Sequence, residues 1–140
     1  MARRKAKDEP ARRLGRVSFV TVREIAGVFP GAVEGTSYGT PAFHVGKSLF
    51  VREHQDGESL VVKIDHEQRT MRIKADPNTF YITDHYLNYP WILVRMANVE
   101  VDDLRELLED AWRLAAPART VASYDREHAR TKTEKKPGGK

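Results

Sequence analysis

The stretch Tyr38-Gly39-Thr40-Pro41-Ala42-Phe43 gives the first indication of the fold, because it has the composition of a rigid corner that leads into a strand. Gly39 can adopt backbone angles that other residues avoid, and Pro41 fixes its own φ angle. We expect Phe43, at the end of the corner, to enter the core.

Four further motifs combine turn residues with aromatic or apolar side chains: Phe29-Pro30-Gly31, Ala75-Asp76-Pro77, Tyr89-Pro90-Trp91 and Ala111-Trp112-Arg113-Leu114-Ala115. The last of them belongs to the clearest helix of the sequence, which we predict over residues 103–116. Asp102 is expected to cap this helix, and Pro117 ends it. Its apolar residues repeat at helical spacing without a gap, at Leu104, Leu107, Leu108, Ala111, Trp112 and Ala115.

Two other helices are predicted from a polar capping residue followed by a helical pattern. Ser18 can cap a helix over about 19–29, and Asp65 can cap one over 65–74, with Met71 and Ile73 facing inward. Alternating or apolar runs bounded by turn residues predict the strands. These strands cover 36–38, 41–45, 47–52, 59–64, 80–82 and 91–98, and one helical turn is expected over 84–88.

The resulting order is one helix, four strands, a helix, two strands and a final helix. Hairpin-length connections imply an antiparallel sheet, and three helices can stack on one of its faces. We therefore predict an α+β two-layer sandwich with an antiparallel sheet of five to six strands. The domain is predicted over residues 18–117, with basic, mobile tails at 1–17 and 118–140.

This order, together with the five motifs, resembles the MmcQ/YjbR-like family of small bacterial proteins. The resemblance covers the predicted domain and leaves both tails outside. It implies a CyaY-like or secretion-chaperone-like α/β sandwich. It also implies DNA binding, because the family is commonly described as DNA-binding through a proposed double-wing arrangement. The resemblance provides no catalytic residues to transfer to this chain.

The composition limits the function classes that remain. The chain has 140 residues and no cysteine, which excludes a disulfide framework, a thiolate metal site and a cysteine nucleophile. No apolar run approaches the ~18 residues of a membrane span, and the N-terminus lacks the apolar stretch of a secretory signal. We therefore expect a cytoplasmic protein without membrane contact, and a monomer.

The net charge of +4 is unevenly distributed. Residues 1–16 hold seven Lys or Arg against two Asp or Glu, and residues 117–140 hold seven against three, so these ends carry +5 and +4. Residues 17–116 hold ten against fifteen and carry −5. The basic ends are either solvated tails or electrostatic arms for nucleic acid, and both interpretations remain open.

No catalytic, metal-binding or phosphate-binding pattern occurs. The histidines form neither a His-x-His nor a His-x-x-x-His pair, and no serine lies in a Gly-x-Ser-x-Gly elbow. The glycines are spread out as turn residues and do not form a Gly-x-Gly-x-x-Gly loop. We expect no enzyme activity, no cofactor and no bound metal.

Two sets of residues are candidates for binding. For DNA, the cations around the middle helix and the hairpin are Lys47, Arg52, Lys63, Arg69, Arg72 and Lys74. For a protein or small ligand, an aromatic-rich segment beside an arginine and the corner predict a groove lined by Tyr38, His44, Tyr86, Tyr89, Trp91 and Arg95. The basic ends favour non-specific DNA binding, and the acidic body favours the protein or ligand alternative.

Overall fold

The computed structural model describes residues 17–135, and it confirms the predicted α+β architecture. The helices are α1 (Phe19–Ala26), α2 (His66–Ala75), α3 (Val101–Ala115) and α4 (Ala118–Lys135), with a 3-10 turn η2 (Asp84–Tyr86). The strands are β1 (Ala32–Ser37), β2 (Thr40–Val45), β3 (Ser48–Glu53), β4 (Ser59–Lys63), β5 (Phe80–Tyr81) and β6 (Trp91–Arg95).

The six strands form one antiparallel sheet in the order β1-β2-β3-β4-β6-β5. The first four strands are joined as hairpins, as their short connections predict. The chain then crosses through α2 to the edge strand β5 and returns as β6, which lies between β4 and β5. A register shift between Phe43 and His44 bends the pairing of β2 with β3.

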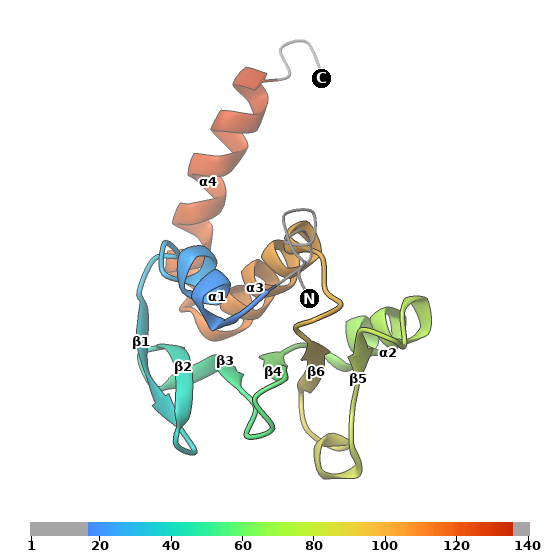
Figure 1. The fold of residues 1–140 in the computed structure, drawn as a ribbon. Helices are drawn as coiled ribbons and strands as arrows, with labels where there is room; N and C mark the ends of the chain where they lie inside the picture. The colour runs from blue at the N-terminus through green and yellow to red at the C-terminus, as the bar shows by residue number, and fades with distance from the viewer. Residues whose placement is uncertain (1–16, 136–140) are drawn as a thin grey trace, which may run out of the picture.

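Helices α1 and α3 cover one face of this sheet, and the loop that contains η2 lies on the opposite side (Figure 1). The predicted apolar stripe of α3 is confirmed, because the first five of its six members are buried and the sixth, Ala115, is half-buried. Trp112 is fully buried in the core, where its ring stacks on Phe29 at 5.5 Å and its Nε1 donates to the Pro30 carbonyl oxygen at 2.8 Å.

Two of the three predicted helix caps are confirmed. The Ser18 side chain accepts from Val20 N, and the Asp65 side chain accepts from Gln68 N. The prediction for α3 is wrong, because the helix begins two residues earlier and its N-cap is Glu100, without a side-chain cap bond. Asp102 instead lies in the first turn, where a negative charge is favourable beside the helix dipole.

The prediction of a mobile tail from residue 118 is corrected by α4, which projects from the domain (Figure 1). Its first turns pack on the core, because Tyr124 lies edge-on to Trp112 at 4.8 Å between ring centres. Arg113 also joins α3 to α4 through an ion pair with Asp125 at 2.6 Å. At the other end, residues 1–16 of the predicted tail lie outside the described residues, and Val17 is buried.

One buried arginine fixes the loop between η2 and β6. Arg69 of α2 is 6% exposed, and its guanidinium donates to the carbonyl oxygens of four residues from the last residue of η2 to the first residue of β6. The acceptors are Tyr86 at 3.1 Å, Leu87 at 2.8 Å, Tyr89 at 2.7 Å and Trp91 at 3.0 Å. The inward position predicted for Met71 is wrong, because its side chain is 57% exposed while Arg69 takes the buried side of α2.

We predict that Trp112→Ala lowers the free energy of unfolding by about 3–5 kcal/mol, because it leaves a large cavity in the core. Leu114→Ala on the same helix is the control, since Leu114 is 48% exposed and its truncation should change stability by about 0.5 kcal/mol or less. Chemical denaturation measures both values. Equal effects of the two substitutions would contradict this account of the core.

We predict that Arg69→Met lowers the free energy of unfolding by about 2–4 kcal/mol, because it leaves several carbonyl groups without their donor. Hydrogen exchange should show lost amide protection in residues 83–91 before the sheet is affected. Lys74→Met is the control, because Lys74 is an exposed cation on the same helix. Unchanged exchange of the loop in the Arg69 variant would exclude the anchoring role.

Candidate functional site

The face of the sheet opposite α1 and α3 carries a hollow of about 670 Å³, which we call the open-face pocket. Its floor contains Leu49 of β3 and Val61 of β4, and its walls come from the β1–β2 turn, the β3–β4 hairpin and the η2 loop. The volume lies in the range that holds a drug-sized molecule. The lining residues are Tyr38, Leu49, Arg52, His54, Gln55, Val61, Thr83, His85, Tyr86, Tyr89 and Trp91.

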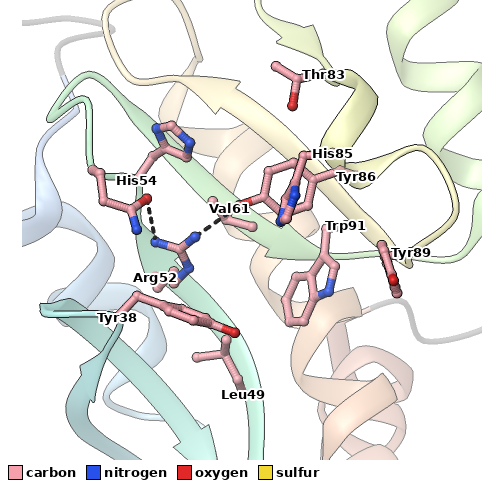
Figure 2. A pocket seen from close by; sticks show the side chains of 11 residues that line it. Tyr38, Leu49, Arg52, His54, Val61, Thr83, His85, Tyr86, Tyr89 and Trp91 are labelled. Carbon is pink, nitrogen blue, oxygen red and sulfur yellow. Dashed lines mark hydrogen bonds between the residues drawn. The ribbon is translucent and has the colours of Figure 1, made fainter.

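Arg52 of β3 lies among these residues, with Tyr38 on one side and Tyr86 on the other (Figure 2). Only 4% of Arg52 is exposed, and its Nη2 donates to the Tyr86 hydroxyl at 2.9 Å. Its Nη1 donates to the Glu53 carbonyl oxygen at 3.1 Å and to the Gln55 side-chain oxygen at 3.3 Å. This network links β3, the following hairpin and the η2 loop.

Tyr38 forms one wall of the pocket from a strained turn. Its φ angle is 53° and that of Gly39 is 79°, so both central residues of the β1–β2 turn have positive φ. Such turns favour Asn-Gly, and a bulky residue at the first position is unfavourable by about 1–2 kcal/mol. The Tyr38 ring is 78% exposed and lies 5.0 Å from the Arg52 guanidinium carbon.

The β3–β4 hairpin brings His54 and Gln55 to the pocket. Asp56 stabilises its tip, because one carboxylate oxygen accepts from Glu58 N at 2.8 Å and Ser59 N at 3.0 Å. Burial acts to raise the pKa of Asp56, but these backbone hydrogen bonds and the nearby His54 outweigh it, so this pKa lies below its ordinary value.

The η2 loop supplies the aromatic wall. Tyr86 is buried and packs with Val61 and Leu93 in a small apolar cluster on this face of the sheet. Tyr89 is 57% exposed, and Trp91 is half-buried. Lys63 of β4, directly opposite Trp91 in the sheet, places its ammonium 5.1 Å from the centre of the Trp91 ring.

The structure brings four of the six predicted groove residues together, namely Tyr38, Tyr86, Tyr89 and Trp91. His44 lies across the sheet from Val33 and Leu49, outside the pocket lining. Arg95 is also outside, because its guanidinium lies 4.0 Å over the Tyr81 ring and donates to the Asn78 carbonyl oxygen.

Sequence reasoning missed several polar lining residues, namely His54, Gln55, Thr83 and His85, and did not place Arg52 in the groove. The signal for a turn after β3 is Gly57, whose φ angle is 74°. That signal shows where the chain turns, but it does not show that the turn faces the η2 loop across the sheet.

The six predicted DNA-binding residues do not form one exposed patch. Arg52 and Arg69 are buried and donate to internal acceptors, Lys63 lies on the Trp91 ring, and Arg72 forms an ion pair with Glu106 at 3.7 Å. Lys47 and Lys74 are exposed, the first in the β2–β3 turn and the second near the end of α2. The pattern of cations in the sequence does not distinguish these two exposed residues from the buried ones.

Two other classes of site are absent from the described part of the chain. No group of three His, Asp or Glu side chains among residues 17–129 is arranged to hold a metal ion. None of the described helices combines the length and the apolar character that a membrane span requires.

Comparisons with known proteins agree with the fold. A Deinococcus radiodurans protein of the DUF419 domain family, DR2400, superposes with a TM-score of 0.61 at 22% identity. The match covers 71% of this chain and 79% of that one. This likeness supports the six-stranded architecture.

Uncharacterised proteins of Mycobacterium bovis and Mycobacterium tuberculosis are 36% identical to the chain over 73 residues. The match covers 51% of this chain and 57% of those relatives, so the chain spans little more than half their length. The sequence profile of the YjbR family matches residues 28–114, from the end of α1 to the end of α3. The chain therefore belongs to the YjbR family.

Proposed function

We propose that this chain is a non-enzymatic binding module that holds a small ligand with a flat ring in the open-face pocket. The observation that carries the proposal is the pocket itself, a hollow of about 670 Å³ with four aromatic side chains around a buried arginine. Ligand sites of this size are usually apolar and aromatic, with few polar groups that fix orientation.

The lining favours a flat ring over a saturated one. Tyr38 and Tyr89 are largely exposed, and Trp91 adds a half-buried ring. An exposed aromatic side chain gains contact area and a favourable ring–ring interaction when a flat molecule covers it. Leu49 and Val61 provide an apolar floor against which the edge of such a molecule can pack.

The chemistry of the lining supports binding more than catalysis. The lining residues include no Asp, Glu or Ser, and among the described residues no hydrogen bond joins the Thr83 hydroxyl to His54 or His85 as a nucleophile–base pair would require. The His54 ring is oriented at the rim by its Nδ1, which accepts a hydrogen bond from Asp56 N at 3.2 Å.

We predict that 2-naphthylmethanol binds the pocket at least fivefold more tightly than its fully hydrogenated analogue. The flat ring can stack on the aromatic wall, whereas the saturated ring cannot, and about 1 kcal/mol separates them. A titration followed by NMR of the ¹⁵N-labelled protein measures both affinities. The shifted amides should be those of residues 49–55 and 83–91.

Tyr89→Ala should weaken binding of 2-naphthylmethanol about fivefold, because it removes an exposed ring of the wall. Leu87→Ala is the matched control on the same loop, since Leu87 is 53% exposed and lies outside the pocket lining. Equal affinity for the flat and the saturated alcohol, or shifts that fall outside the pocket, would refute the proposal.

Weak, non-specific DNA binding is the second candidate, favoured by the +5 charge of residues 1–16 and the family resemblance. Neutralised phosphates release counterions, so the affinity would fall with salt by about 0.9 log units per phosphate for each tenfold rise in salt. Of the six cations predicted for DNA, only Lys47 in the β2–β3 turn and Lys74 near the end of α2 are exposed, and Arg52 and Arg69 are buried.

We expect that replacing the seven Lys and Arg of residues 1–16 by Gln flattens the salt dependence of duplex binding. Lys47→Gln with Lys74→Gln is the control, because it removes exposed cations of the folded body. A salt titration by fluorescence anisotropy compares the two variants with the unmodified chain. A slope that changes only in the control would assign DNA contact to the domain, and no binding at low salt would remove this candidate.

A further inference from the structure

We infer that the ligand of the open-face pocket carries an anionic group, a carboxylate or a phosphate, and that Arg52 receives it. This inference rests on the proposed function, because it names the chemical class that the same pocket takes. Three observations support it. The guanidinium of Arg52 is buried without an opposite charge, the pocket lining contains no acidic residue, and the strained Tyr38 lies over this guanidinium.

The charge of Arg52 is buried without an opposite charge. Its three hydrogen-bond partners are a backbone carbonyl, an amide side chain and a hydroxyl, all of them neutral. Among residues 17–129, no carboxylate forms an ion pair with it. A buried cation is unfavourable unless an anion or a full set of acceptors compensates for its lost hydration.

The Arg52 guanidinium also has N–H groups without an acceptor. Arginine has five N–H groups. Two on Nη1 and one on Nη2 are used, so Nε and the second N–H of Nη2 have no acceptor in the described part of the chain. Buried donors almost always have acceptors, and two parallel N–H groups match the oxygens of a carboxylate or phosphate.

The surroundings of Arg52 would favour an anion. The pocket lining contains Arg52, His54 and His85 but no acidic residue, although residues 17–116 carry −5. Lys63 adds a second cation beside the Trp91 ring. An anion in the pocket would therefore meet attraction from Arg52 and the nearby Lys63, in a protein whose body otherwise repels anions.

Tyr38 places an aromatic ring beside this charge at a backbone position that favours asparagine. The ring lies 5.0 Å from the Arg52 guanidinium carbon. Tyr38 is 78% exposed, so little of its side chain packs against the rest of the protein. Strained backbone conformations persist where the side chain has a role. A ring at this position can stack on the flat part of a ligand while Arg52 binds its anionic group.

The test compares three probes with the same ring on the full chain, namely 2-naphthylmethanol, 2-naphthoate and 2-naphthyl phosphate. We expect at least one anion to bind about tenfold or more tightly than the neutral alcohol, as charge-assisted hydrogen bonds would give. Whichever anion binds more tightly distinguishes a carboxylate ligand from a phosphate ligand. The NMR shifts should again fall in residues 49–55 and 83–91.

Arg52→Gln should reduce the preference for the anions to twofold or less while the alcohol still binds. Arg95→Gln is the matched control, because Arg95 is an exposed arginine outside the pocket lining. Tyr38→Asn is the second variant. It should keep or raise the midpoint of thermal unfolding, because it relieves the strained turn, and it should weaken binding of all three probes several-fold.

The outcomes separate the inference from the proposed function. If the alcohol binds in the pocket and neither anion binds more tightly in the unmodified chain, the inference is wrong and the proposed function stands. This comparison needs no variant, so it remains decisive if Arg52→Gln does not fold. If the anions are preferred equally by the Arg52 and Arg95 variants, Arg52 is not the receiving group.

Discussion

The hydrogen bonds of the Arg69 guanidinium are the interactions on which the face with the open-face pocket depends. The Arg69 guanidinium donates hydrogen bonds to four carbonyl oxygens between the end of η2 and the start of β6. This segment has little regular structure of its own. With these acceptors satisfied, the loop lies over the sheet and keeps Tyr86, Tyr89 and Trp91 in place. The buried Arg69 therefore fixes the shape of the pocket face, and its hydrogen bonds offset the loss of its hydration.

The two faces of the sheet consequently serve different purposes. The face under α1 and α3 is filled by a continuous core centred on Trp112, which fixes the helices and the strand register. The opposite face has only a small apolar cluster around Tyr86 and leaves a hollow beside it. Because the first face provides most of the apolar burial, the second can hold a strained turn and a buried cation without loss of the fold.

The sequence predicted the fold well, because helical and strand periodicity report directly on one buried face. The α3 stripe, the caps at Ser18 and Asp65 and the hairpin order all follow from local spacing. The last helix was missed because its pattern is weak and only a few side chains, such as Tyr124, pack on the core. Three groove residues, Tyr86, Tyr89 and Trp91, follow from aromatic clustering, and Tyr38 follows from the corner motif. Arg52 was placed with the DNA-binding cations because no local pattern shows which face of the sheet it occupies.

The position of β6 has a consequence for how the domain folds. The strands β1 to β4 are neighbours both in sequence and in the sheet, so they can pair as soon as they are synthesised. The strand β6 must instead insert beside β4 after α2, β5 and the η2 loop have been made, and such long-range pairing slows folding. Because the pocket needs walls from both parts, it can form only when the whole sheet is complete. Occupancy of the pocket would therefore report on the finished domain rather than on a folding intermediate.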